Sequence, residues 1–426
     1  GLPSGVQPLS LLINHPALAD ELIAILGLAP RLAEDVGQRP ALLDVMLEPA
    51  FSTPLAESGT ISAEAYEARL ARVDGFEQVI NEARRIVREE RLRIGAQLLR
   101  GRARASEAAS AYSQLAALSV AAMARAADAE IAKRHGPAPG RWHALGMGKL
   151  GGGELSADSD LDLIVVYEAT AEQSRGERPL EASVWFARFT QRLVSALSAP
   201  TEEGELYPVD LALRPSGSAG PVAVSLQRFE TYYREEAWVW ERMAMTRASV
   251  IASSGKPGAV ERAIKAAVND HTLDAGAVRQ AALDMRARLE RDKPAGSAWD
   301  LKMRPGGLID IEFIAQAGLV AARLGPCPST REALGVLASK GILPKAEAQT
   351  LADAHRLYGD VTQLTRLAHG NGFDAGEASA PFAARLAEEA GCGTLEALSN
   401  ALAQTADAVR SIFISQIGDL SAASDG

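Results

Sequence analysis

The stretch from Gly146 to Tyr167, GMGKLGGGELSADSDLDLIVVY, constrains this chain most, because a glycine-rich loop leads into a strand that opens with two acids. Asp160 and Asp162 are two residues apart, so on a strand both carboxylates project from one face. Leu161 and Leu163 then face the opposite layer. Two carboxylates beside a loop with exposed backbone amides suit a magnesium-bound nucleoside triphosphate. The stretch therefore predicts a metal and nucleotide site at the start of a strand.

Two other phosphate-binding loops are rejected on spacing. The loop formally matches the G-x-G-x-x-G fingerprint of dinucleotide-binding folds. That fold needs a helix of about three turns before the next strand, whereas only about ten residues separate Gly151 from Leu161. A Walker loop is excluded because Lys149 precedes the glycine cluster and no Ser or Thr follows it.

A second apolar segment, 206–213, supplies a third acid. Asp210 lies between Val209 and Leu211, where a carboxylate is costly unless it has a partner such as a metal ion. If the segment is a strand, Asp210 and Arg214 share one face. With the earlier pair, three carboxylates from two adjacent strands form the basis of a two-metal site for phosphoryl transfer.

Length and charge indicate a multidomain protein without a broad nucleic-acid surface. At 426 residues the chain is long enough for two or three domains. Hydrophobic residues make up 47% and charged residues 23%, which is typical of a globular protein. The 44 basic and 54 acidic residues give a net charge of −10, which argues against nucleic acid as a partner.

Cysteine usage and hydropathy favour the cytoplasm. Cys327 and Cys392 are far apart and predict reduced thiols, although one structural bridge stays open. The most apolar segment, Leu115–Ala124, is too short for a membrane span, so no membrane partner is expected. The start at Gly1, without a methionine or a secretory leader, leads us to expect part of a longer protein.

The pattern of the chain predicts three domains in an α+β fold. Residues 1–136 read as a helical domain, and the sequence GPAPG from Gly136 is the clearest boundary. Residues 137–254 read as an α/β unit, with strands at 142–145 and 161–167 and a helix at 181–197. Residues 255–426 read as a C-terminal bundle, with seven helical segments between Ala259 and Ile417.

Some side chains allow more than one interpretation. The charged stretch 82–93 predicts a solvated helix face, with a regulatory docking surface as the alternative. Ser62 predicts the start of a long helix that continues through Ile80. Trp238 and Trp240 lie two apart on an apparent helix, so at least one is expected in the core, and adenine stacking is the less favoured role. The six histidines have no ligand spacing, and no metal is assigned to them.

Taken together, four motifs resemble the glutamine synthetase adenylyltransferase family, within the nucleotidyltransferase superfamily of the DNA polymerase beta type. They are GMGKLGGGEL from Gly146, VDLALRPSG from Val209, EAWVWE from Glu236 and RPGGLIDIEF from Arg304. The family's full chain has two nucleotidyltransferase halves, and the last two motifs look more like the carboxyl-terminal, adenylylating half. The resemblance implies a mostly helical fold with a small mixed-sheet nucleotidyltransferase domain flanked by helical bundles. Asp158 departs from the family's usual, less acidic segment.

The resemblance implies transfer of AMP from ATP to a tyrosine hydroxyl of glutamine synthetase, with release of pyrophosphate. Asp160 and Asp162 would hold two Mg²⁺ ions, and Asp210 would complete the second site and orient the hydroxyl. The residues expected to meet the nucleotide are Gly148, Lys149, Gly151, Ser159, Arg214, Lys302 and Arg304. For Lys302 and Arg304, a charged loop that caps the following helix is an equally good interpretation, with Asp310 and Glu312 facing a neighbour.

The resemblance also implies regulators and leaves alternatives open. Glutamine and the PII signalling protein are expected as regulators of nitrogen metabolism, with the N-terminal bundle as a candidate for receiving the signal. The chain could instead be the adenylyl-removing half. It could also be a nucleotidyltransferase acting on RNA or a small molecule, or a regulatory module that has lost activity. The intact aspartates argue against the last of these.

Overall fold

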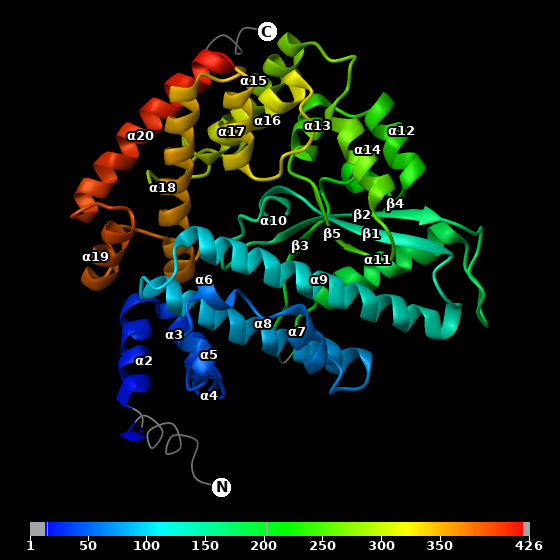
Figure 1. The fold of residues 1–426 in the computed structure, drawn as a ribbon, viewed down its shortest axis with the longest axis horizontal. Coiled ribbons are helices and arrows are strands. Elements are labelled where there is room, and N and C mark those ends of the chain that lie inside the picture. The colour runs from blue at the N-terminus through cyan, green and yellow to red at the C-terminus, as the bar shows by residue number, and fades with distance from the viewer. Residues whose placement is uncertain (1–12, 15, 202, 421–426) are drawn as a thin grey trace.

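The structure, a computed structural model, describes residues 13–14, 16–201 and 203–420 and is α+β, as predicted. Helices dominate, and one five-stranded sheet lies between an N-terminal and a C-terminal group of helices (Figure 1). The N-terminal helices are α2 (Pro16–Leu28), α3 (Pro30–Gln38), α4 (Leu42–Met46), α5 (Pro49–Ser52), α6 (Leu55–Ser58), α7 (Ala63–Leu70), α8 (Phe76–Leu99) and α9 (Ala105–His135). The start at Gly1 lies outside the described residues.

The sheet is mixed and has β2 near its centre. The strands are β1 (Gly140–Gly146), β2 (Leu161–Ala169), β3 (Val209–Asp210), β4 (Ala223–Ser225) and β5 (Ser249–Ser253). β1 pairs antiparallel with β2 and β5, while β3 and β4 both pair in parallel with β2. β3 lies beside the beginning of β2 and β4 beside its end. The two acid-bearing strands therefore start side by side.

Side-chain alternation along β2 separates two cores. Leu161 and Leu163 are buried in the core that α9 and α11 (Ala182–Ser198) cover, as predicted. Ile164 and Val166 face the other core, which is covered by α12 (Leu226–Glu235), α13 (Val239–Met245) and α14 (Gly258–Val268). Asp162 lies on this second face at the beginning of the strand, because residues two apart share a face.

Aromatic side chains fix α11 against the sheet. The rings of Trp142 and Phe189 stack with centroids 5.1 Å apart, and those of Tyr167 and Phe186 stack at 4.4 Å. Trp142 also donates an indole hydrogen bond of 2.8 Å to Asp128 of α9. Aromatic pairs of this kind add about 0.5–1.5 kcal/mol beyond area burial. The platform under the acid-bearing strands is thus rigid.

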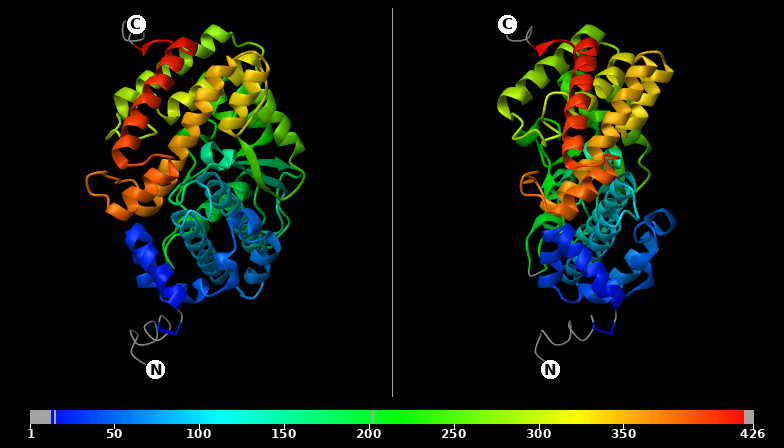
Figure 2. Two further views of the ribbon diagram at one scale, coloured as in Figure 1. Left: turned by 60° about the vertical axis from the view of Figure 1, so that its left-hand side comes forward. Right: turned by 90° about the vertical axis from the view of Figure 1, so that its left-hand side faces the viewer.

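The C-terminal helices complete the fold on the other side of the sheet (Figure 2). They are α15 (Ala275–Asp292), α16 (Leu308–Ala322), α17 (Thr330–Ser339), α18 (Lys345–His369), α19 (Ala380–Glu389) and α20 (Leu395–Gln416), which together with α14 confirm the seven predicted segments. α18 contacts α3 and α19 contacts α2, so the two helical groups also meet beside the sheet. One hydrophobic core runs through all three predicted segments, and the division into domains stays a prediction.

The structure corrects several helix and strand predictions. The predicted long helix from Ser62 is two helices, because α7 ends at Leu70 and Gly75, with a φ of 95°, precedes α8. The charged stretch 82–93 is not simply solvated, since Arg84 and Arg93 are buried. Within 206–213 only Val209 and Asp210 form a strand, because a turn follows directly.

No helix in the described part of the chain has the length and apolar character that crossing a membrane requires. The expectation that at least one of Trp238 and Trp240 lies in the core is wrong. Trp238 precedes α13 and is 69% exposed, and Trp240 is half-buried. Cys327 and Cys392 are free thiols, as predicted.

Candidate active site

The three predicted aspartates come together where β2 and β3 begin. Asp162 and Asp210 are register partners in the parallel pair, and Asp160 lies just before β2. One carboxylate oxygen from each of the three lies within 4.8 Å of the others. Oxygen ligands at this spacing are those that magnesium prefers. The donor set therefore fits a divalent cation.

The electrostatics of Asp162 point the same way. Burial raises the pKa of its carboxyl to about 6, and the negative charges of Asp160 and Asp210 add to the effect, against the opposing charges of Lys302 and Arg247. Like charges held together in a half-buried place are unfavourable without a counter-ion. A bound cation would remove this repulsion and keep Asp162 ionised.

The glycine loop approaches the aspartates at Gly148. The loop follows β1 and forms the short helix α10 (Gly148–Gly152), which the backbone N–H of Met147 anchors by a 2.9 Å hydrogen bond to the carbonyl of Asp162. Gly148 has a φ of 53°, and a Cβ atom there would lie 2.9 Å from Oδ2 of Asp162. Only glycine lets the backbone come this close without strain.

Two lysines bring positive charge to the site. Burial and the neighbouring charge of Lys302 lower the pKa of Lys149 to about 8, although Glu312 opposes the shift. Lys302 is exposed, and its charge acts on both Asp162 and Lys149. The structure thus brings Gly148 and the charge of Lys302 to the three aspartates, while Lys149 follows Gly148 in the glycine loop.

A cavity of 250 Å³ adjoins Lys149 behind the glycine loop. Gly152, Gly153 and Glu154 form one wall, and residues of α18 form another, among them Asp360. Burial and the charge of Glu389 raise the pKa of Asp360 to about 6. The cavity offers space beside Lys149 and the glycine loop for a part of a ligand that the three aspartates do not contact.

Sequence reasoning missed Arg247, which holds the glycine loop. It is buried, and its guanidinium lies 2.5 Å from Glu154 and 3.0 Å from Glu312 of α16. Glu154 also accepts a 2.9 Å hydrogen bond from the backbone of Thr330. Burial would raise the pKa of Glu154, but Arg247 and His355 together with this hydrogen bond lower it to about 2. Nothing in the sequence around Arg247 marks it, because its two partners are distant in the chain.

Four other predicted nucleotide residues make structural contacts instead. Ser159 Oγ accepts a 2.9 Å hydrogen bond from the backbone of Ser156, and a Cβ on Gly151 would overlap the carbonyl of Arg247. Arg214 does not share a strand face with Asp210, because β3 ends at Asp210. The guanidinium of Arg214 instead donates a 2.8 Å hydrogen bond to the carbonyl of Leu211. Arg304 donates to the carbonyl of Ala298 at 2.8 Å. Their predicted roles toward a nucleotide stay predictions.

Asp310 and Glu312, the acids of the motif RPGGLIDIEF, face charged neighbours, as the helix-capping interpretation predicted. Asp310 is buried, forms an ion pair with Arg286 and lies 3.0 Å from Arg410 of α20. It also accepts a 2.8 Å hydrogen bond from the backbone of Gly306. Asp310, in the first turn of α16, therefore fastens the loop of Lys302 to the C-terminal helices.

Helix α8 holds the segment that precedes β3. Arg84 donates a 2.6 Å hydrogen bond to Thr201 Oγ1 and also bonds the carbonyl of Ala199. Arg88 lies 3.0 Å from the carboxylate of Glu203, and Arg91 packs over the ring of Tyr207 at 4.4 Å. The arginines at 84, 88 and 91 share one helix face. This face holds the segment that leads to Asp210.

Helix α3 contacts the segment that precedes β2 in a similar way. Arg31 forms an ion pair with Asp158, two residues before Asp160. The acid that departs from the family's usual pattern thus binds the N-terminal helices to the site. Both acid-bearing strands are preceded by a segment that these helices hold.

Comparison with known proteins gives the family. A family model described as glutamate-ammonia ligase adenylyltransferase matches residues 19–264, more than half of the chain. The chain belongs to the glutamate-ammonia ligase adenylyltransferase family. This confirms the resemblance, and the matched range contains the glycine loop and all three aspartates. A second model, described as GlnD PII-uridylyltransferase, matches residues 277–416, which lie in α15 to α20.

Curated relatives agree with this family. Each is named bifunctional glutamine synthetase adenylyltransferase/adenylyl-removing enzyme. The relative from Mesorhizobium japonicum is 44% identical over 88% of this chain and 38% of its own length. Those from Agrobacterium fabrum and Xanthobacter autotrophicus are 40% and 41% identical over 98% and 96% of this chain, and over 43% and 42% of their own lengths. The chain thus spans about two fifths of the length of the curated relatives it matches. It corresponds to one half of the bifunctional enzyme for which these relatives are named.

Proposed function

We propose that this chain is the adenylylating half, which transfers AMP from ATP to a tyrosine hydroxyl of glutamine synthetase and releases pyrophosphate. The observation that carries the proposal is the cluster of Asp160, Asp162 and Asp210 on neighbouring parallel strands beside a glycine loop. The names of the relatives give glutamine synthetase as the protein on which they act. Resemblance of the later motifs to the carboxyl-terminal half favours adenylylation.

The side chains of the site would divide the work among them. Asp160, Asp162 and Asp210 would hold magnesium, with two ions proposed. Bound magnesium supplies positive charge that neutralises a triphosphate and lowers the pKa of a hydroxyl. Lys149 and Lys302 would meet the phosphates, and the adjoining cavity would take the rest of the nucleotide.

The reaction forms one bond and breaks one. The tyrosine oxygen attacks the α-phosphorus, the bond from that phosphorus to the bridging oxygen breaks, and pyrophosphate leaves with the electron pair. Asp210 is exposed, so its carboxylate can accept a hydrogen bond from the hydroxyl of a docked protein and orient it. The hydroxyl proton passes to solvent. Positioning and charge supply most of the catalysis in such transfers.

Regulation and location belong to the same proposal. We propose that PII and glutamine control the activity, that the N-terminal helices of residues 1–136 receive the signal, and that the protein works in the cytoplasm, where ATP is available. The contacts of Arg31 and Arg84 with the segments before β2 and β3 support a path from these helices to the aspartates. The match of α15 to α20 to a PII-uridylyltransferase model supports a link to PII signalling.

The test follows AMP from ATP labelled at the α-phosphate onto glutamine synthetase in the presence of magnesium. We expect Asp160→Asn and Asp162→Asn each to lower the rate at least about a thousandfold, because removed charge at such a site costs several kcal/mol of transition-state stabilisation. Asp74→Asn, at an exposed position between α7 and α8, is the control that removes the same charge elsewhere and should keep most of the activity. An active double variant of Asp160 and Asp162 would refute the assignment.

The adenylyl-removing reaction is the second candidate, because the relatives are named for both activities. Adenylylated glutamine synthetase incubated with this chain and inorganic phosphate distinguishes the two. Release of ADP without any forward transfer would identify the adenylyl-removing half. Transfer of AMP to RNA or to a small molecule, with none to glutamine synthetase, would point to a different nucleotidyltransferase.

A further inference from the structure

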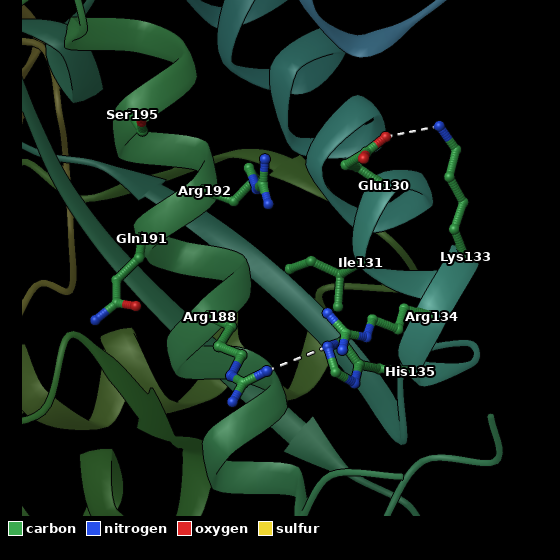
Figure 3. A pocket seen from close by; sticks show the side chains of 9 residues that line it. All are labelled: Glu130, Ile131, Lys133, Arg134, His135, Arg188, Gln191, Arg192 and Ser195. Carbon is green, nitrogen blue, oxygen red and sulfur yellow. Dashed lines mark hydrogen bonds and ion pairs between the residues drawn. The ribbon is translucent and has the colours of Figure 1, made fainter. Parts of the chain in front are cut away.

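A hollow of 550 Å³ lies between the last turns of α9 and the helix α11 (Figure 3). Arg188 and Arg192 line it from α11, and Lys133, Arg134 and His135 line it from α9. It is remote from the aspartates. β2 carries Asp162 near one end, while its other end, Ala169, pairs with Gly140 shortly after α9. Seven residues of strand separate these ends, roughly 23 Å.

The hollow is basic in an acidic protein. Four cationic side chains and one histidine line it against one carboxylate, Glu130, which pairs with Lys133 at 2.7 Å. The whole chain has a net charge of −10. Among the described residues, no carboxylate lies within ion-pair distance of Arg134, Arg188 or Arg192. The positive charge of the hollow is therefore not neutralised from within.

The stability of α9 explains only part of this charge. Cations in the last turn of a helix interact favourably with its dipole, which accounts for Lys133, Arg134 and His135. Arg188 and Arg192 lie in the middle of α11, where the dipole gives no such benefit. They are four residues apart and so project from one face toward α9, as Figure 3 shows.

Both arginines are held by neutral groups. His135 Nδ1 donates to the carbonyl of Arg178 at 2.7 Å, so His135 Nε2 is free to accept from Arg188 at 3.1 Å. The guanidinium of Arg192 lies 5.3 Å from the ring centroid of Phe76 in α8. Each guanidinium is thus pre-oriented and keeps further N–H donors for another molecule.

We propose that this basic hollow docks an acidic segment of a protein partner, with carboxylates of the partner paired to Arg188 and Arg192. Guanidinium groups match carboxylates in a bidentate fork. A nucleic acid is disfavoured, because none of the described residues that line the hollow is a Phe, Tyr or Trp on which bases could stack. The inference extends the proposed function, since a protein substrate needs contacts beyond the one reacting tyrosine.

The test measures binding of a fluorescein-labelled hexaglutamate peptide by fluorescence anisotropy, without nucleotide or magnesium, so that its failure leaves AMP transfer unaffected. We expect the wild-type chain to bind at low salt and the double variant Arg188→Glu/Arg192→Glu to bind at least tenfold more weakly. Arg279→Glu/Lys345→Glu changes the net charge equally at two exposed positions elsewhere and should bind like the wild type.

Three results would overturn the proposal. The first is equal affinity of both double variants, which would make binding a matter of net charge. The second is displacement of the peptide by inorganic phosphate at a concentration far below that of equal ionic strength in sodium chloride, which would indicate a small-anion site. The third is tighter binding of a twelve-nucleotide single-stranded DNA than of the peptide. Circular dichroism of each variant confirms that the loss is not unfolding.

Discussion

Gly148 lies against Asp162 so closely that a Cβ atom would stand 2.9 Å from its Oδ2, with a backbone φ of 53°. The glycine loop and the acid-bearing strand therefore form one unit, in which the loop's conformation and the position of a metal-binding carboxylate are coupled.

Replacing Gly148 by alanine should separate this coupling from backbone strain. The methyl group would push Asp162 aside, so we expect Gly148→Ala to lower the rate of AMP transfer at least tenfold and to raise the magnesium concentration needed. Gly391→Ala is the matched control, with a φ of 69° and nothing within 4 Å of its Cβ. Both should lose about 1 kcal/mol of stability. Equal activities of the two variants would contradict the coupling.

Arg84 is predicted to position Asp210 from α8. In Arg84→Met, the loop at Ala199 and Thr201 loses its hydrogen bonds, so β3 should be held less firmly. We expect kcat to fall about tenfold and the magnesium requirement to rise, with little change in KM for ATP. Arg72→Met removes an exposed arginine between α7 and α8 and should have little effect. An unchanged kcat in a destabilised Arg84→Met would show a purely structural role.

Glu154 should stabilise the protein in neutral solution and lose that effect in acid. Its pKa in the folded chain is about 2, below its usual 4.5. The ionised carboxylate therefore contributes fully above about pH 4.5, and the contribution disappears as the pH falls toward 2. Glu154→Gln should lower the free energy of unfolding by up to about 3 kcal/mol at pH 7. Urea denaturation at pH 7 and pH 3 tests this, and an equal loss at the two pH values would contradict it.

The contribution of Asp360 to stability should depend on pH in the opposite sense. Its pKa is raised to about 6, from a usual value of 3.8. Ionisation of this buried carboxyl therefore costs stability as the pH rises from about 4 through 6. Asp360→Asn should be more stable than the wild type by about 1 kcal/mol at pH 8, and the difference should vanish near pH 4. Thermal unfolding across this range is the measurement, and a pH-independent difference would argue against the shift.

The ion pair between Asp310 and Arg286 has no solvent exposure on either side chain. Removing the charge of Asp310 leaves the buried Arg286 with Glu290, at 3.1 Å, as its remaining carboxylate partner, and Asp310→Asn should cost about 3–5 kcal/mol. Asp292→Asn removes a partner from exposed pairs and should cost less than about 0.5 kcal/mol. Chemical denaturation of both variants provides the comparison, and similar losses would refute the distinction.

The sequence by itself determined the local features of the site. The spacing of Asp160 and Asp162 sets one face of a strand, because side chains alternate with period two. The glycine cluster marks a loop that must approach other backbone closely. Helical periodicity located the C-terminal segments, since each buries one apolar face. The three aspartates and their meeting place were predictable for these reasons.

Only the tertiary structure decided what depends on residues distant in the chain. Arg247 joins Glu154 to Glu312, Arg31 reaches Asp158, and Arg84 reaches Thr201, although no local pattern pairs them. The prediction that Arg214 lies on a strand was wrong, because the chain turns after Asp210 and the guanidinium of Arg214 bonds a backbone carbonyl in that turn. A charged side chain takes the partner that packing brings within reach. Periodicity fixes which way a side chain points, while the partner that it meets is fixed by how the helices pack around the sheet.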